Sequence, residues 1–588
     1  MTAPAATFDS PLGPHLRRLG RAAPVRFAPV LAVLFVLLVW PLAMLAVGSF
    51  RTAAPGFPGE WTLKAWGSVF NVPAVRESVA NSLTISFVTT AAAALLAAGL
   101  AFLSERTDAP LRRWITPAIV VMFATPGLFY AVGYALLGNA YTGLFNQIAR
   151  SLTGLENLTL IDIETWGGLL GVMVLKKVAV IYLFLIGPFR ALDPSHDEAS
   201  LTAGAGTFET FWRINLPILA PALTGAILLG VVTGLQAFDM IVILGWPQDI
   251  QVITTRIFEF ITVAAEPDYA RASVLSLSLL LLIAALSFLQ AKILGTRSFF
   301  TVGGKAREGQ RLKLGRLRWV FGALIGLYLF AAAVAPIGSV AFSSIQPFPG
   351  VYENLSLRNY AEVLRIQRVV PSLLTTLALS AGVGLAAMGL AVAAVQAGRA
   401  GGARTAVVIR FTTLIPLAMP GVVTALAIAW AFVSTPGLQQ LYGTIYLTGL
   451  AMIACVMPFA MQAAGAAMAQ ISPDLQEAAR TSGASGPRAL ADVTLQLIAP
   501  SFLTGWFMAA ILTSGNLDVP LLLDAPGQRP IAAVIYDLNN RGDFSIACAL
   551  LMLTLLAKAG VGLGGYAVLK AGSGLARRRL SSLAKDRS

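Results

Sequence analysis

The sequence predicts an all-α membrane protein with about 12 transmembrane helices, arranged as two parallel repeats of six. Three observations predict this fold class: an apolar composition, a series of continuous apolar runs, and an internal repeat. Of the 588 residues, 57% are apolar and 12% are charged, and that charged share is about half of what soluble domains carry. This composition excludes a water-soluble enzyme. Continuous runs such as Val30 to Val39 also exclude the alternating strands of a membrane β-barrel.

The apolar runs are long enough to cross a bilayer as helices of about 20 residues each. The first run follows four arginines and is too long for the core of a cleaved signal peptide, so we expect an uncleaved first span. Basic residues gather at the ends of the runs, which favours membrane orientation over nucleic-acid binding. With a cytoplasmic N-terminus, roughly 28 Lys and Arg fall inside and about 11 outside. The predicted spans are 28–50, 79–103, 115–137, 166–188, 218–243, 273–293, 319–342, 372–396, 406–434, 443–466, 499–522 and 545–569.

The first six spans and the last six repeat each other in sequence. LLAAGLAF at residues 95–102 matches LAAMGLAV at residues 385–392, and Pro126-Gly127 matches Pro420-Gly421. Because each copy has an even number of spans, the second copy enters the membrane in the same sense as the first. Such a parallel repeat encloses a central path. The predicted organisation is a cytoplasmic tail at 1–27, a first half at 28–293, a basic cytoplasmic linker at 294–318, a second half at 319–569 and a basic cytoplasmic tail at 570–588.

The loop between the fourth and fifth spans of each half predicts a short cytoplasmic helix. These loops cover residues 193–217 and 472–496, and each begins with a helix-capping Asp or Ser followed by proline. Gly204 and Gly483 then allow a tight turn, so we expect two short helices at an angle in each loop. Small residues on the first helix fit a pocket in a partner protein, whereas a plain amphipathic loop on the membrane surface is the alternative. The presence of two copies at matching positions favours the partner pocket.

Both loops resemble the signature of the transmembrane subunits of binding-protein-dependent ABC importers: E-A-A, three residues, G, nine residues, I, one residue, L-P. The first loop departs from it at Ser200. The second has Gln496 in place of the proline, so its helix is expected to leave at a different angle. The resemblance implies an ATPase-coupling role for the matching positions, which are Glu198, Ala199, Gly204, Ile214, Leu216, Pro217, Glu477, Ala478, Ala479, Gly483, Val493 and Leu495.

The fused layout further resembles permeases of the ferric-iron type, notably in TPGLFYAVGYALL at 125–137 and LDPSHDEASLTAGA at 192–205. This resemblance implies the type I importer permease fold in a bacterial inner membrane, with both termini cytoplasmic and no catalysis by the chain itself. The expected partners are two copies of a cytoplasmic ATPase, which bind ATP and Mg, and a periplasmic or lipid-anchored solute-binding protein. Ferric iron is the expected solute, and thiamine, aminoethylphosphonate or polyamines are the alternatives. An ion-coupled secondary transporter is the alternative of a different class.

Two features of the sequence agree with separate partner chains. Gly303-Gly304-Lys305-Ala306 lacks both the earlier glycine and the Ser or Thr of a phosphate-binding loop, so we expect ATP to bind elsewhere. The predicted outer loops are a few dozen residues at most, too short for a solute receptor domain.

Among the ionisable residues within the predicted spans, Lys176, Lys177, Asp239 and Asp518 are the candidates for the translocation path. The lysines lie midway along a span, where a charge costs several kcal/mol unless it meets water or a partner. The lysines line or gate the path, or else they form structural pairs or the span boundary is misplaced. The aspartates occupy matched positions near the outer leaflet. A twofold axis can bring them face to face as oxygen ligands for a hard cation. The alternative is that each carboxylate lies at a wet interface or is bonded to neighbouring backbone. The two histidines and two cysteines are too few for a metal site or a catalytic centre.

Overall fold

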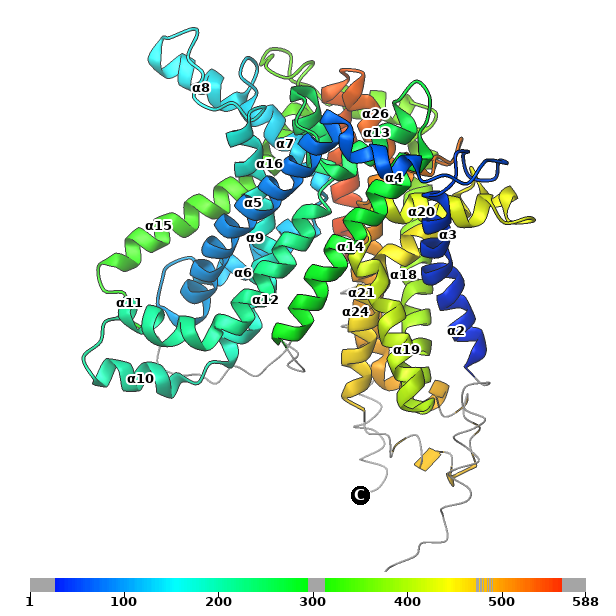
Figure 1. Cartoon of the computed structure of the whole chain (residues 1–588). Helices are drawn as coiled ribbons and strands as arrows, with labels where there is room; N and C mark the ends of the chain where they lie inside the picture. Colours follow the sequence, from blue (N-terminus) through cyan, green and yellow to red (C-terminus); the bar gives the residue numbers. More distant parts are fainter. Residues whose placement is uncertain are drawn as a thin grey trace, which may run out of the picture.

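The computed structural model describes residues 27–294 and 312–562, apart from several positions between 472 and 489. Long helices run side by side between two ends of the molecule (Figure 1). The lower end carries α10 (Pro194–Thr202) and α11 (Thr207–Thr210), and the upper end carries the short helices α8 (Leu144–Thr153), α13 (Ile253–Thr262) and α26 (Ile531–Asn540). In this described part, ten helices are long and apolar enough to cross a membrane, or up to 12 if each of two bent pairs is one span. The predicted fold class is confirmed.

The described membrane helices follow the predicted order. Those of the first half are α2 (Ala28–Leu34) with α3 (Trp40–Gly48), α5 (Pro73–Arg106), α6 (Arg112–Ala124) with α7 (Gly127–Gly138), α9 (Trp166–Ala191), α12 (Leu216–Leu235) and α14 (Tyr269–Leu294). Those of the second half are α15 (Leu317–Leu329) with α16 (Ala335–Ser343), α18 (Val369–Ala400), α19 (Gly402–Leu414) with α20 (Gly421–Val433), α21 (Ile445–Ala469), α24 (Gln496–Ser514) and the last span, Phe544–Gly562.

Small residues let the long helices pack closely. In the second half, a Cβ atom added to Gly384 of α18 would lie 2.8 Å from the carbonyl oxygen of Trp506 on α24. In the first half, α5 buries a stripe of small side chains, a composition that allows helix backbones to approach within a membrane. This stripe consists of Ser78, Ser82, Ser86, Thr89, Ala93, Ala97 and Ala101.

The repeat predicted from sequence also appears in matched hydrogen bonds at the upper end. The backbone N–H of Ile253, the first residue of α13, donates to Ser82 Oγ on α5 at 2.8 Å. In the second half, the backbone N–H of Ile531, the first residue of α26, donates to Thr376 Oγ1 on α18 at the same distance. Each half therefore attaches a short upper helix to its longest membrane helix in the same way.

The first span of each half packs against the opposite half. The hydroxyl groups of Tyr130 and Tyr134 on α7 donate to the carbonyl oxygens of Ala332 and Ala331, just before α16. On the other side, α3 packs against α20 of the second half, where a Cβ atom added to Gly48 would lie 2.3 Å from the ring of Trp430. Figure 1 shows the dark-blue α3 beside α20 and α16 beside α7. The two halves therefore interlock.

Two predicted spans are bent rather than straight. The pair α6 and α7 is bent by 103°, and the pair formed by 402–418 and α20 by 116°. Both bends occur at a Pro-Gly dipeptide. The residue before each proline, Thr125 or Met419, has an extended backbone conformation, because proline disfavours a helical residue in front of it and supplies no N–H donor.

The fifth membrane helix of each half ends earlier than predicted. α12 ends at Leu235 and α24 ends at Ser514, before the predicted ends at 243 and 522. Asp518 opens the short helix α25 (Asp518–Leu522), and Asp239 precedes a π-helical turn at Ile241–Gly245. The prediction that these aspartates lie within straight spans is therefore wrong: each lies just beyond the end of its membrane helix.

Candidate functional site

The two bends each bring an aspartate against the first residue of the following helix. A Cβ atom added to Gly127 would lie 2.9 Å from Asp239 Oδ2, and one added to Gly421 would lie 2.0 Å from Asp518 Oδ2. These glycines begin α7 and α20. Each carboxylate therefore lies at a helix N-terminus, where the free N–H groups and the helix dipole favour negative charge. Glycine is required at both positions because a side chain would occupy the space of the carboxylate.

Each bend also contacts the opposite half. A Cβ atom added to Gly515 would lie 2.8 Å from the Pro126 ring. The side-chain amide of Gln236 donates to the carbonyl oxygen of Leu417 at 2.9 Å, three residues before Pro420. Gly515 and Gln236 occupy matched positions directly after α24 and α12. Both bends therefore lie at the interface between the halves.

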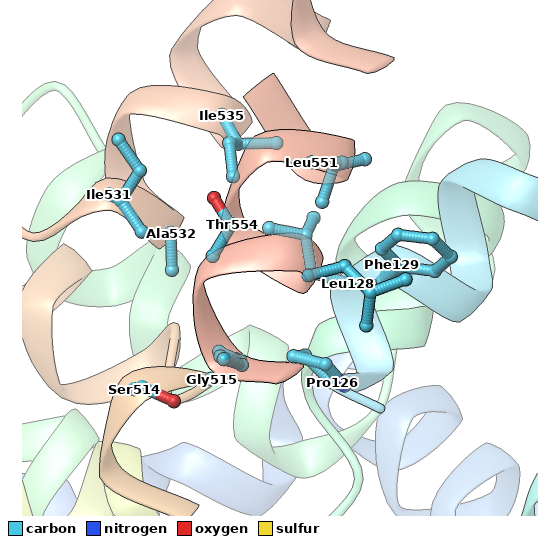
Figure 2. A pocket seen from close by; sticks show the side chains of 12 residues that line it. Pro126, Leu128, Phe129, Ser514, Gly515, Ile531, Ala532, Ile535, Leu551 and Thr554 are labelled. Atoms are coloured by element: carbon cyan, nitrogen blue, oxygen red, sulfur yellow. The ribbon is translucent and has the colours of Figure 1, made fainter. Parts of the chain in front are cut away.

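Beside the first bend, mainly apolar side chains of the two halves line a small pocket. Figure 2 shows Pro126, Leu128 and Phe129 of the first half on one side of a small pocket, with residues of the second half around the rest of it. The pocket holds only about 20 Å³. The second-half residues that line it are Ser514, Gly515, Ile531, Ala532, Ile535, Leu551, Thr554, Leu555 and Lys558.

A larger cavity of about 380 Å³ lies next to the same bend and the ends of α12 and α24. Its lining includes the four ionisable residues that the sequence singled out as path candidates, Lys176, Lys177, Asp239 and Asp518. The sequence thus identified every charged residue in the lining of this cavity. It missed the neutral polar ones, such as Asn516, because an amide two residues before an aspartate gives no distinctive signal.

Lys176 is bonded to the end of the helix before the first bend. Its ammonium group donates to the carbonyl oxygens of Met122 and Thr125, and it lies 5.5 Å from the ring centre of Tyr130. Carbonyl groups at a helix C-terminus lack helical partners, and a lysine can satisfy them. In the second half, the matched position holds Cys455.

Lys177 points to a different neighbour. Its ammonium group donates to Thr89 Oγ1 at 2.6 Å and to Thr90 Oγ1 at 3.2 Å, both on α5. The divergence of the two lysines follows from the rotation of about 100° between neighbouring residues of a helix. Both lysines have structural partners, and both also line the cavity. The structure is therefore compatible with a structural role and with a path-lining role. Their role in transport stays a prediction.

The loop of the first half contains the predicted capped helix. Asp193 Oδ1 accepts a hydrogen bond from the backbone N–H of Ser195 at 3.0 Å, and α10 follows. The turn after α10 has Gly204 at a φ of +86°, which favours glycine. The prediction of a second separate short helix is wrong, because α11 continues through a π-helical turn at Phe211–Asn215 directly into α12. Ile214, Leu216 and Pro217 lie in this continuous helix.

The first loop presents an exposed surface at the lower end of the molecule. Glu198, Ala199 and Gly204 are exposed. Next to them, Phe208 is 70% exposed and Trp212 is 47% exposed. Large exposed apolar side chains on a loop of this kind are typical of an interaction surface. The sequence contains this signal in TFETFW at 207–212, but reasoning from the small residues alone overlooked it.

The second loop is described only in part. Gly483 has a φ of +91°, matching Gly204. Ala478 and Ala479 are exposed and half-buried, and Glu477 lies outside the described residues. Val493 is half-buried and Leu495 is exposed at the end of a π-helical turn, Leu490–Leu495, which leads into α24. A π-helical turn precedes the fifth membrane helix of both halves, so Gln496 in place of proline does not remove it.

Comparisons with known proteins identify the family. Residues 387–563 match the binding-protein-dependent transport system inner membrane components. The chain is 25% identical over 536 residues to the ferric transport system permease protein FbpB of Actinobacillus pleuropneumoniae, covering 88% of this chain and 74% of that one. It is 30% identical over 347 residues to a putative ferric transport permease of Haemophilus influenzae, covering 58% and 53%.

A third relative matches a shorter stretch. The chain is 29% identical over 136 residues to the putative 2-aminoethylphosphonate transport system permease protein PhnV of Salmonella typhimurium, covering 23% of this chain and 51% of that one. With the matched halves, the 10 to 12 membrane helices and the two glycine-hinged loops, these similarities lead to one assignment. Residues 387–563 match the binding-protein-dependent transport permeases, and the chain, which is similar to ferric transport permeases over most of its length, is a multi-pass protein of the inner membrane.

Proposed function

We propose that the chain forms the translocation path of an ATP-driven importer for ferric iron delivered by a separate binding protein. The observation that carries this proposal is the pair of matched aspartates, Asp239 and Asp518, which line one cavity at the interface of the halves. Carboxylate oxygens suit a hard cation such as Fe³⁺. The similarity to ferric transport permeases over most of the chain supports the same solute.

In this proposal, the two carboxylates provide transient contacts. Asp239 and Asp518 are half-buried, and both line the cavity. Each carboxylate lies against the glycine that begins a helix of its own half, so a rotation of the halves would change the distance between the two carboxylates. A cation could therefore be held between them in one arrangement of the halves and released in another.

The energy comes from two copies of a cytoplasmic ATPase that dock on the loops at 193–217 and 472–496 and bind ATP and Mg. The chain itself performs transport and no hydrolysis. The exposed Ala199 and the exposed apolar Phe208 support a docking surface on the first loop. In this arrangement the lower end of Figure 1, which carries α10 and α11, faces the cytoplasm, and the binding protein docks at the upper end. Both chain termini are then cytoplasmic.

A second candidate solute is an aminoethylphosphonate, because one relative carries that name. The two cavity lysines would suit its phosphonate group. Their ammonium groups, however, already donate to oxygen atoms of the protein, namely Met122 O and Thr125 O, and the hydroxyl group of Thr89. The carboxylates therefore favour the cation.

The test is uptake of radioactive ferric iron into vesicles that contain the complete complex, with the binding protein outside and ATP inside. We expect ATP-dependent uptake that excess aminoethylphosphonate, thiamine or polyamine does not reduce. The Asp239→Asn plus Asp518→Asn variant is expected to lose uptake while the ATPase still co-purifies. Uptake at the wild-type rate in this variant would show that the carboxylates are structural only, and competition by aminoethylphosphonate would favour the second solute.

Docking is tested separately by co-purification. Gly204 and Gly483 adopt positive φ values, so aspartate at both positions would strain the turn after each loop helix. We expect the Gly204→Asp plus Gly483→Asp variant to lose the nucleotide-binding partner that the wild-type chain brings down. A matched control is Gly465→Ala on α21, where an added Cβ atom meets nothing within 4 Å. A wild-type chain that brings down no ATPase and takes up solute with an ion gradient would contradict the proposed function.

A further inference from the structure

The cytoplasmic end of α5 holds the first loop by a buried ion pair. Arg106, the last residue of α5, pairs with Asp197 on the first turn of α10. Their side chains are 9% and 3% exposed, although most of α10 is open to solvent. Arg106 also donates to the carbonyl oxygen of Leu192 at 3.2 Å, just before α10 begins. A single guanidinium group therefore fixes both the start and the first turn of this helix.

Because Asp197 is buried, its negative charge is compensated by Arg106 and not by water. Its Oδ1 atom is buried and has no hydrogen-bond donor among the described residues. Separating a buried charge from its partner is strongly unfavourable, because the remaining charge is left without compensation in a region that excludes water. The pair therefore resists opening, and a displacement of α10 must move the end of α5 with it.

Two further contacts tie the same turn of α5 to the loop and its surroundings. Glu105 pairs with Arg190 at the end of α9 at 3.1 Å. The ring of Phe102 lies 4.5 Å, centre to centre, from that of Phe211 in the π-helical turn before α12. The end of α5 thus contacts the segments on both sides of the loop.

From this end, α5 reaches the cavity and the opposite side of the membrane. Its 34 residues extend for about 51 Å at 1.5 Å per residue. Part of the way along it, Thr89 accepts the hydrogen bond from Lys177 of the cavity lining. Near its other end, Ser82 accepts the hydrogen bond that attaches α13. A rigid α5 can therefore transmit a movement of the loop to both places.

The second loop differs from the first in sequence at the position of this aspartate. By the alignment of the two loops, the position matching Asp197 is Gln476, which carries no charge. Near the end of α18, Arg399 donates to the carbonyl oxygens of Met468 and Ile471, both at 3.1 Å. The arginine of the second half is therefore bonded to the end of the preceding membrane helix.

We propose that the Arg106–Asp197 ion pair is the mechanical link that makes α5 move with the first coupling loop, whereas the matched position of the second loop, Gln476, carries no charge. This inference rests on the proposed function, because it requires an ATPase that moves the loop. Arg106 and Asp197 are positioning residues: they bind neither solute nor ATP. Breaking the pair uncouples transport from hydrolysis without removing the docking surface.

The test uses the complete complex with Asp197→Asn, which keeps the shape of the side chain and removes its charge. We expect the ATPase to co-purify and to hydrolyse ATP, while ferric uptake falls by about tenfold, within the usual range of coupling between linked sites. The matched control is Glu362→Gln, which breaks the exposed Arg358–Glu362 pair on the upper helix α17 (Arg358–Arg365) and should leave uptake unchanged. Uptake by Asp197→Asn within twofold of wild type would overturn the inference.

A second readout distinguishes a lost link from general damage. Thr262 and Asn540 are exposed at the matching ends of α13 and α26. Spin labels at Thr262→Cys and Asn540→Cys, with Cys455 and Cys548 replaced by serine, report the distance between the upper ends of the halves. We expect ATP to change this distance in the wild-type background and not with Asp197→Asn. An unaltered ATP response in that variant would overturn the inference.

A third variant covers the case in which Asp197→Asn does not assemble. Arg106→Gln removes the positive charge that pairs with Asp197 and keeps a side-chain amide as a hydrogen-bond donor. Reduced uptake with the ATPase still bound supports the link, and normal uptake contradicts it. If the wild-type chain itself brings down no ATPase, the proposed function fails. Normal uptake by the Arg106 or Asp197 variant, with the ATPase bound, contradicts only the role of the ion pair.

Discussion

Gly421→Ala tests whether Asp518 is held against the start of α20. The added Cβ atom would lie 2.0 Å from Asp518 Oδ2 and 2.4 Å from its Cγ. To reach the 3.4 Å of an ordinary contact from 2.0 Å, the oxygen has to move by about 1.4 Å. Forced packing of this kind lowers the free energy of unfolding by about 1–3 kcal/mol. At the matched Gly127, the contact with Asp239 is 2.9 Å, so Gly127→Ala requires a smaller shift and should cost less.

The assay is a double-mutant cycle on the free energy of unfolding, measured by SDS titration of the purified chain in mixed micelles. Asp518→Ala removes the atoms that the new methyl group would meet. We therefore expect Gly421→Ala to cost about 0.5 kcal/mol or less in the Asp518→Ala background, an interaction energy of about 1–2 kcal/mol. An equal cost in both backgrounds would refute the reasoning. Gly465→Ala is the control and should stabilise the helix by about 0.5–1 kcal/mol, because an added Cβ atom there has open space.

Three further variants test other parts of the structure. Tyr130→Phe removes the hydrogen bond to the carbonyl oxygen of Ala332 and should lower the free energy of unfolding by about 1 kcal/mol in the same titration. Gly384→Ala would place a Cβ atom 2.8 Å from the carbonyl oxygen of Trp506 and force α18 away from α24, at a cost of about 1–3 kcal/mol; an unchanged midpoint would contradict this packing. Lys177→Met keeps the length of the side chain and removes its charge, so uptake should fall while the ATPase still co-purifies. Unchanged uptake would show that this lysine does not line the path.

The sequence was sufficient to predict the membrane helices and the internal repeat, because both produce patterns along the chain. Apolar runs located the membrane helices, and matched motifs paired Asp239 with Asp518, which line one cavity in the folded chain. The bends were not predicted, since hydropathy records composition and not direction. Pro126-Gly127 contained the signal, because proline disfavours a helical residue before it and glycine leaves room for a carboxylate.

Contacts between distant segments account for the rest. Arg106 and Asp197 are 91 positions apart, and neither is unusual in sequence, because arginine at a helix end and aspartate in a loop are common. The partners of Lys176 are main-chain carbonyl groups, which have no residue type to recognise. Such pairs are determined by the packing of whole helices and not by local pattern.

The central claim is that the two glycine-hinged loops lie in the cytoplasm and contact an ATPase. It is tested most directly by photo-crosslinking from an unnatural amino acid at Ala199 of the first loop and at Ala479 of the second, in intact cells. The account predicts that both positions form an adduct with a nucleotide-binding subunit. Failure of both positions to form this adduct, or labelling of cysteines at either position by a membrane-impermeant reagent added outside the inner membrane, would contradict it.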